Sequence, residues 1–314
     1  GVLLRNPQGQ GAHQHDRTGK LSRIPLTLLD SLIQLKPKGL PTLLLIPVLY
    51  GLGWIAVRPL EPFGLTPEHL ALIGTLISFL LFVLLLPRWS RLRWGARNGW
   101  RALGLSGGGQ GGRPAPPVAW LRGTGLAGGL LLLVVIPVLA GSWGHWLGEW
   151  SLGRCLNALL LAIGVGLAEE LIFRAWLWEE LNQLLGSTGG VLAQAACFSL
   201  VHTRFNLGVW PMLGLLSGLF VLGLVLAVQR QLDGGSLWGS IGLHGGLVGG
   251  WFLLQSSLLQ LSPDAPAWLV GPGGLNPNPL GGLVAAASLT VVLNRQLTAV
   301  AKAARPDTGA RRES

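Results

Sequence analysis

The sequence predicts an all-α fold: a polytopic membrane bundle of about eight transmembrane helices with both termini in the cytoplasm. First, only 11% of the 314 residues are charged, whereas soluble domains have about 25%. Second, the hydrophobic half of the chain comes in blocks near 20 residues, about the length that crosses a ~30 Å hydrocarbon core. Third, Lys and Arg gather on one side of the resulting topology, which is typical of cytoplasmic loops.

Eight apolar blocks give the predicted spans, listed here in chain order: 40–57, 69–87, 119–142, 155–178, 189–205, 208–228, 235–257 and 279–295. With a cytoplasmic N-terminus, the inside segments hold 20 of the 23 Lys and Arg residues, if Arg122 and Arg174 are counted with the nearest cytoplasmic span ends and Arg295 with the tail; only Arg58, Arg154 and Arg204 fall outside. A wrong number of spans would distribute the Lys and Arg residues over both sides of the membrane. Because the positive-inside rule explains the net charge of +10, we expect the lipid bilayer as a partner and no nucleic acid.

The loop 88–117, "RWSRLRWGARNGWRALGLSGGGQGGRPAPP", divides the chain. Its first part spaces Arg and Trp as an interfacial amphipathic helix does, and its second part is a flexible Gly/Pro-rich linker. We therefore expect 1–113 to be a cytoplasmic tail, two transmembrane helices and an Arg/Trp-rich loop. Residues 114–300 are the expected functional bundle, and 301–314 a basic C-terminal tail. Residues 1–38 do not read as a signal peptide.

Few ionisable residues inside the predicted spans are candidates for a functional site, namely Glu169, Glu170, Arg174, His202 and His244. Such residues are costly in a membrane and usually face a cavity or one another. At helical i,i+4 spacing Glu170 and Arg174 can pair. Glu169, rotated about 100° from Glu170, is then left to face a different side.

Three of these residues are predicted to meet at one depth. Glu169 lies 17 residues before the short loop at Gly186, and His202 lies 16 residues after it, so an antiparallel hairpin places them level. His244, in the run "SIGLHGGLVGGW", lies about ten residues, or roughly 15 Å, from the loop 233–235. It reaches the same level if the hairpin projects about 10 Å into the cytoplasm, with Trp residues at the interface.

A carboxylate and two imidazoles that meet in a water-filled pocket are the groups that peptide-bond hydrolysis needs. Glu169 would act as a general base that takes a proton from the attacking water. His202 and His244 would polarise the carbonyl and stabilise the oxyanion, or, with Glu169, bind a catalytic zinc ion of the His₂Glu type. The sequence leaves mechanisms with and without metal open.

Three motifs in register carry a resemblance to a known family. Glu-Glu-x-x-x-Arg, Phe-x-x-x-His and the histidine of His-x-x-x-Asn are met, in order, by Glu169, Glu170 and Arg174, by Phe198 and His202, and by His244; Phe173 precedes the arginine, as is common in the family. The chain resembles, over about residues 155–255, the CPBP family of CAAX proteases and bacteriocin-processing enzymes, also called Abi.

The resemblance implies an intramembrane endopeptidase similar to the type II CAAX prenyl endopeptidase, acting on a membrane-associated protein or peptide from the cytoplasmic side. It associates the first glutamate and both histidines with catalysis. From their i,i+4 spacing, Glu170 and Arg174 are expected in the same catalytic site as a supporting pair. Phe173 and Phe198 are the expected substrate-binding residues. The family's breadth suggests a bacterial plasma membrane or internal membrane, where prenylated CAAX proteins are not expected substrates.

The third motif is incomplete, because Val248 occupies the position of the asparagine. Losing one oxyanion donor costs about 10²–10³ in rate, and Asn206 and Gln194 are the nearest substitutes in sequence. The second hypothesis is therefore a catalytically inactive membrane scaffold or bacteriocin self-immunity protein of the same fold. A small transporter is less favoured, because the ionisable groups lie at one level and not along a path.

Simpler interpretations exist for each signal. The two glutamates and the arginine can be a structural charge cluster, His202 can be satisfied by a carbonyl group, and the glycines around His244 can serve helix packing alone. Ser106, in a rhomboid-like Gly-x-Ser-Gly string, and Ser199, three residues before His202, are weaker nucleophile candidates. The string "HQHD" at 13–16 is a possible adventitious metal site.

Overall fold

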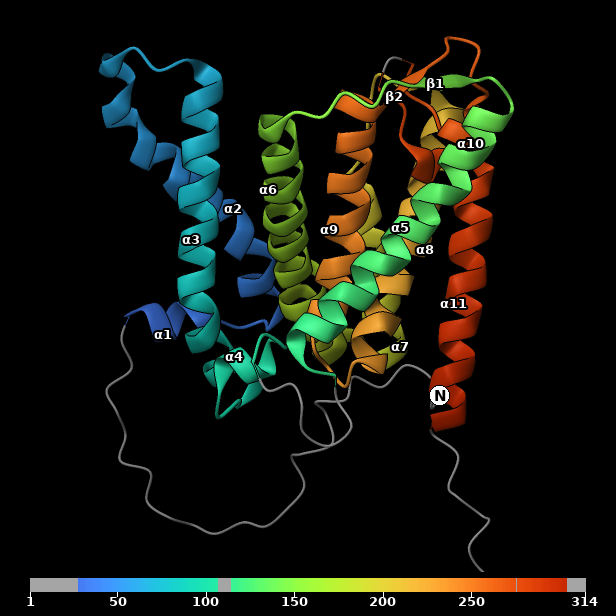
Figure 1. Cartoon of the computed structure of the whole chain (residues 1–314). Coiled ribbons are helices and arrows are strands. Elements are labelled where there is room, and N and C mark those ends of the chain that lie inside the picture. Colours follow the sequence, from blue (N-terminus) through green and yellow to red (C-terminus); the bar gives the residue numbers. More distant parts are fainter. Residues whose placement is uncertain (1–27, 107–113, 275, 304–314) are drawn as a thin grey trace, which may run out of the picture. The chain divides into compact units, whose positions relative to one another are not determined.

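The computed structural model describes residues 28–106, 114–274 and 276–303, and it confirms a polytopic helical bundle (Figure 1). Six helices in this part of the chain are long and apolar enough to cross a membrane. The described residues fall into two compact units that meet in sequence after Ser106. The "HQHD" string and residues 304–314 of the predicted C-terminal tail lie outside the described residues.

The first unit is a helical hairpin. Its elements are α1 (Leu28–Ile33), α2 (Gly39–Val57), a 3₁₀ turn (Arg58–Phe63), α3 (Pro67–Trp94) and α4 (Gly99–Ala102). The two long helices α2 and α3 run side by side (Figure 1). Close approach at their crossing needs glycine, because a Cβ at Gly53 would lie 2.3 Å from the carbonyl oxygen of Gly74.

Helix α3 is longer than predicted. The sequence favoured an end at Pro87, but the helix continues to Trp94 with this proline inside it. A proline removes one backbone donor, and the turns after Pro87 make tertiary contacts. Arg88 Nε donates to Asp30 Oδ1 at 2.6 Å, and Arg93 donates to the carbonyl oxygens of Ile33, at the end of α1, and Lys38, just before α2. Only the four-residue α4 is therefore left of the separate interfacial helix predicted after residue 87.

The second unit is the bundle. Its elements are α5 (Pro116–Ala140), β1 (Gly144–Trp146), α6 (Leu152–Glu169), a π-helix (Glu170–Leu177), α7 (Trp178–Leu200), α8 (Val209–Leu232), α9 (Trp238–Leu253), a second π-helix (Leu254–Leu258), β2 (Leu259–Leu261), α10 (Ala267–Val270), a 3₁₀ turn (Pro279–Gly281) and α11 (Leu283–Ala303). The two strands pair antiparallel, with His145 opposite Gln260. This short sheet was not predicted from the sequence.

Each predicted span coincides with a helix, but the number of crossings remains a prediction. The six candidates include one 49-residue stretch, Leu152–Leu200, that covers two predicted spans. It is interrupted at Gly186, whose φ of 75° and ψ of 174° are not helical, so the predicted break is present. Helix α9 has only 16 residues and continues as the π-helix to Leu258.

Helix α9 packs between α5 and α6, and glycines make this possible. A Cβ on Gly242 would lie 2.2 Å from the carbonyl oxygen of Trp120, and one on Gly245 would lie 2.0 Å from that of Ala162. Small residues of this kind let membrane helices approach closely. The glycine run around His244 thus does serve packing, and the same packing fixes the depth of the histidine.

Candidate active site

Glu169 lies between the two histidines. Its Oε2 atom is 3.5 Å from Nε2 of His202 and 3.7 Å from Nε2 of His244. The glutamate ends α6, His202 follows α7, and His244 is in the middle of α9. The predicted meeting of three residues from three helices is therefore confirmed. Glu169 and His202 are 25% and 32% exposed, whereas His244 is 5% exposed.

The second ring nitrogen of each histidine is bound to the protein. His202 Nδ1 is 2.7 Å from the carbonyl oxygen of Phe198, and His244 Nδ1 is 2.9 Å from Glu170 Oε1. A carbonyl group only accepts, so Nδ1 of His202 carries a proton. These bonds orient both rings with Nε2 toward Glu169, as second partners commonly fix a functional imidazole. The simpler interpretation of His202, a carbonyl bond, accounts for only one of its nitrogens.

Glu170 and Arg174 form the predicted ion pair, with Oε1 and NH1 3.1 Å apart and both side chains fully buried. Because Glu170 Oε1 also contacts His244, the pair holds a histidine as well as the helix, which the sequence did not predict. The guanidinium carbon of Arg174 lies 4.0 Å from the centroid of the Phe198 ring, a cation–π contact. Buried charges without partners are costly, so these contacts keep the arginine in place.

The helix that carries these charges is locally widened. Residues Glu170–Leu177 form a π-helix, and the N–H group of Trp178 donates to Phe173 O, five residues back. The sequence predicted a regular α-helix on which Glu169 and Glu170 face different sides. In the structure both glutamates contact His244, and the wide turn begins between them. π-helical turns inside α-helices are frequent at functional sites.

Phe173 and Phe198 lie behind the histidines, in the hydrophobic core. Their ring centroids are 5.3 Å apart, and the Phe198 ring packs edge-on against His244 at 5.5 Å. Neither side chain lines the cavity that adjoins Glu169 and the two histidines. In this structure they support the histidines, and substrate contact by these two residues remains a prediction.

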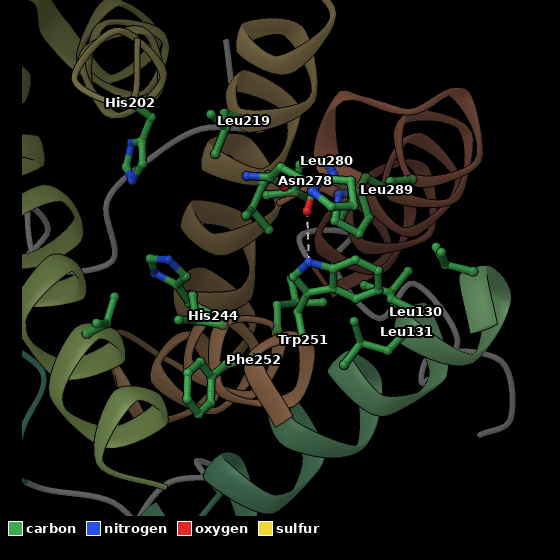
Figure 2. Close-up of a pocket in the computed structure, with 18 of the residues that line it drawn as sticks. Leu130, Leu131, His202, Leu219, His244, Trp251, Phe252, Asn278, Leu280 and Leu289 are labelled. Carbon is green, nitrogen blue, oxygen red and sulfur yellow. Dashed lines mark hydrogen bonds between the residues drawn. The ribbon is translucent and has the colours of Figure 1, made fainter. Parts of the chain in front are cut away.

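A cavity of about 420 Å³ opens beside Glu169 and the histidines (Figure 2). Its lining includes the apolar side chains of Leu130, Val134, Leu219, Leu247, Trp251 and Leu289, and the polar ones of Arg204, Gln255, Asn276, Asn278 and Ser288. Ligand pockets are typically 300–1,000 Å³, mostly apolar, with a few polar groups. Figure 2 shows His202 and His244 on one side of the cavity and Leu289 on the other.

The cavity has amide groups that sequence reasoning missed. Val248 does line the cavity, so the third motif places no amide there. Neither expected substitute supplies the missing amide. Gln194 is buried, and its Nε2 donates to the carbonyl oxygens of Val191 and Gly223. Asn206 is exposed and does not line the cavity.

Asn278, in contrast, lines the cavity, and its Oδ1 accepts the N–H of Leu280 at 3.1 Å. The loop that holds it is tied to α9 by Trp251, whose Nε1 donates to Pro277 O at 3.0 Å (Figure 2). The Asn-Pro-Asn-Pro string at 276–279 predicts a turn, and nothing in it signals a cavity.

The serine candidates lie elsewhere. Ser199 Oγ donates to Leu216 O on α8 at 2.6 Å, while His202 Nδ1 is bound to Phe198 O, so the two do not form a dyad here. Ser106 is exposed at the end of the hairpin unit.

The predicted zinc ligands Glu169, His202 and His244 do not form a ready metal site. Among residues 28–106, 114–274 and 276–303, no group of three or more His, Cys, Asp or Glu side chains is arranged to hold a metal ion. The carboxylate oxygen between the histidines nevertheless has no hydrogen-bond partner among these residues. This oxygen is therefore open to an incoming hydrogen-bond donor.

Comparison with known families separates the two units. Residues 20–98 match a domain of unknown function, DUF8676, and residues 151–249 match the family described as type II CAAX prenyl endopeptidase Rce1-like. No curated protein and no solved structure matches the chain. The second match contains Glu169, His202 and His244, and it confirms that this part of the chain resembles the CAAX proteases.

Proposed function

We propose that this protein is an intramembrane endopeptidase that hydrolyses a peptide bond in a membrane-associated protein or peptide. One observation carries the proposal: a single carboxylate oxygen lies between the Nε2 atoms of two histidines, at 3.5 and 3.7 Å, beside an apolar cavity. The Rce1-like match over the same residues supports it. Ionisable groups at such depth are expensive and are usually kept for function.

Glu169 is the general base of the proposed reaction. Its buried Oε2 takes a proton from water, and the hydroxide oxygen bonds to the carbonyl carbon of the peptide while the C=O electron pair moves to the oxygen. Glu169 then gives this proton to the nitrogen as the C–N bond breaks, which releases a carboxylic acid and an amine. Glu169 therefore serves both proton transfers, and its carboxylate is ionised again at the end of each cycle.

The histidines are the proposed electrophilic groups. With Nδ1 of His202 already donating to Phe198 O, a second proton at Nε2 makes the ring an imidazolium beside the Glu169 carboxylate. Donors of this kind, fixed in advance, stabilise the oxyanion of the tetrahedral intermediate. His244 contributes a second Nε2, and Glu170 holds its other nitrogen.

The cavity supports an apolar substrate segment. Most of its wall is leucine, valine and aromatic surface, and its polar groups are few. A peptide that enters from the bilayer therefore buries apolar side chains there, while amides such as Asn278 can bind its backbone.

The test is peptide cleavage by the purified full chain in nanodiscs. A library of peptides with apolar segments of varied sequence is incubated with wild type and Glu169→Gln, and the fragments are identified by mass spectrometry. The proposal expects defined cleavage products that depend on Glu169. Equal cleavage by both proteins would exclude Glu169 as the base.

A metal-assisted form of the same reaction is tested separately. Elemental analysis of purified wild type is compared with the His202→Ala/His244→Ala double variant. Near-stoichiometric zinc that disappears in the variant would add a metal ion, held by Glu169, His202 and His244, to the mechanism. Equal trace metal in both proteins would leave the protein groups as the catalysts.

The second candidate function is a catalytically inactive scaffold or self-immunity protein, and Val248 favours it. The cavity has a valine where the family motif has asparagine, so an oxyanion donor is missing at that position. Val248→Asn separates the candidates, because a weakened peptidase gains rate from the new donor and a scaffold gains none.

A further inference from the structure

Arg230 is a fully buried cation that the proposed chemistry does not use. It lies in the last turn of α8, at a helix end that the sequence places on the cytoplasmic side, where arginines are common. Only 1% of the residue is exposed, however. Its guanidinium lies over the ring of Trp178, 5.6 Å from the centroid. Because a buried charge is costly unless paired and hydrogen-bonded, the bonds that it makes explain its place.

The first hydrogen bond of Arg230 satisfies a carbonyl group that has no backbone partner at the end of the π-helix. The N–H of Trp178 reaches back five residues to Phe173 O, and α-helical bonding resumes in α7. Where hydrogen bonds that reach five residues back give way to bonds that reach four residues back, the carbonyl after the last π-helical acceptor receives no backbone N–H. A buried carbonyl of this kind needs another donor. Arg174 O is that next carbonyl, and NH1 of Arg230 donates to it.

The second bond reaches the turn before α9. Nε of Arg230 donates to Gly235 O at 3.2 Å, and the N–H of Gly235 returns a bond to Arg230 O at 2.8 Å. The turn depends on left-handed backbone at Gly234 and Gly235, with φ of 64° and 91°. It leads directly into the helix that carries His244. One side chain therefore joins the backbones of two segments, one with the glutamates and one with the histidine.

We propose that Arg230 is a positioning residue: it holds the π-helix in register and so keeps Glu169 and Glu170 against His244. The inference rests on the proposed function of Glu169. If the wide turn relaxed to a regular α-helix, the residues before it would rotate by about 100° relative to α7. Such a rotation would carry the carboxylate of Glu169 away from His202, which follows α7.

The experiment uses two substitutions of Arg230 and a matched pair at Arg154. Arg230→Lys keeps the charge but loses the planar fork that reaches two carbonyls at once, and Arg230→Met removes the charge as well. Arg154→Lys and Arg154→Met are the controls. Arg154 lies in the first turn of α6, far along that helix from Glu169, is partly exposed, and contacts Glu149 and Ser257.

Two readouts separate positioning from plain stabilisation. Hydrogen–deuterium exchange of the amides at 170–178 in nanodiscs should rise at least severalfold in both Arg230 variants and stay unchanged in both controls. In peptide cleavage, kcat should fall roughly 100-fold, the effect of about 1 Å of misplacement, with KM within about twofold. Thermal unfolding and gel filtration report the folded fraction.

The outcomes also separate this inference from the proposed function. If Glu169→Gln cleaves as wild type does, the proposed function fails, while exchange at 170–178 still tests the contact with the π-helix. If Glu169→Gln is inactive but the Arg230 variants keep wild-type kcat and exchange, the inference is wrong. Loss of fold in both Arg230 variants, or loss of activity only in proportion to the folded fraction, would also overturn it, because a purely structural arginine behaves in that way.

Discussion

The ion pairs of the hairpin and the central ion pair of the bundle differ in how deeply they are buried. In the hairpin, Arg58 and Glu61 are both about half exposed, and Asp30, which is 11% exposed, pairs with Arg88, which is 38% exposed. In the bundle, Glu170 and Arg174 pair in the middle of a helical segment with no exposure. Ion pairs near water contribute little and cost little, whereas burial of each ion costs several kcal/mol. A charge at the rim therefore needs no special role, and a charge pair in the interior points to function.

The bundle's buried polar residues also contact one another in a chain. Glu170 contacts both Arg174 and His244, and Glu169 contacts His244 and His202. Removal of one member leaves the others buried without their partner. Carboxylate-to-amide substitutions in each unit measure this difference.

The largest effect is expected for Glu169→Gln. The amide keeps the size of the side chain but cannot accept the proton of water, so kcat should fall about 10²–10⁴-fold. Cleavage of the best library peptide measures it. Glu149→Gln is the matched control, since this exposed glutamate lies just before the first turn of α6. A kcat for Glu169→Gln within threefold of wild type would contradict the general-base role.

Glu170→Gln should be the most destabilising carboxylate change. It leaves the guanidinium of Arg174 buried without its counter-charge and releases Nδ1 of His244, so the free energy of unfolding should fall by about 3–5 kcal/mol. Equilibrium unfolding in mixed micelles measures it. A loss below about 1 kcal/mol would mean that this buried pair behaves like one at the rim, and the contrast between the units would disappear.

The sequence predicted the helical fold and the central residues of the site because both depend on strong local signals. Apolar blocks and charge asymmetry define membrane helices, and the distances from Gly186 to Glu169 and His202 define a common depth. The π-helix could not be predicted in this way, since Arg230, which donates to the carbonyl of Arg174 at its end, lies 56 residues further along the chain.

Other features were hidden for similar reasons. An arginine at the end of α8 looks like any cytoplasmic charge until burial is known. Asn278 reaches the cavity from a loop after α10, beyond the matched residues 151–249. The position of Pro87 within α3 depends on contacts of the following turns, which no local pattern shows.

A smaller effect is expected for Asn278→Ala. Its Oδ1 is held by Leu280 N–H, so the amide nitrogen is oriented without being used in that bond. If it donates to the substrate backbone, its loss costs about 1 kcal/mol, or roughly a fivefold rise in KM with kcat nearly unchanged. Peptide cleavage over a range of concentrations measures it, with Asn206→Ala, outside the cavity lining, as the control. An unchanged KM would remove Asn278 from substrate binding.

The smallest effect is expected for Asp30→Asn in the hairpin. The chemical change is the same as in Glu170→Gln, because a carboxylate that pairs with an arginine becomes an amide. Arg88, however, is partly exposed and can turn its charge toward water, as long cationic side chains do at membrane interfaces. The free energy of unfolding should fall by less than about 1 kcal/mol, and cleavage should be unchanged. Both variants are measured in the same micelles, so the difference between the two losses is the direct test. A loss for Asp30→Asn as large as that for Glu170→Gln would show that the hairpin's rim is as dry as the bundle's interior.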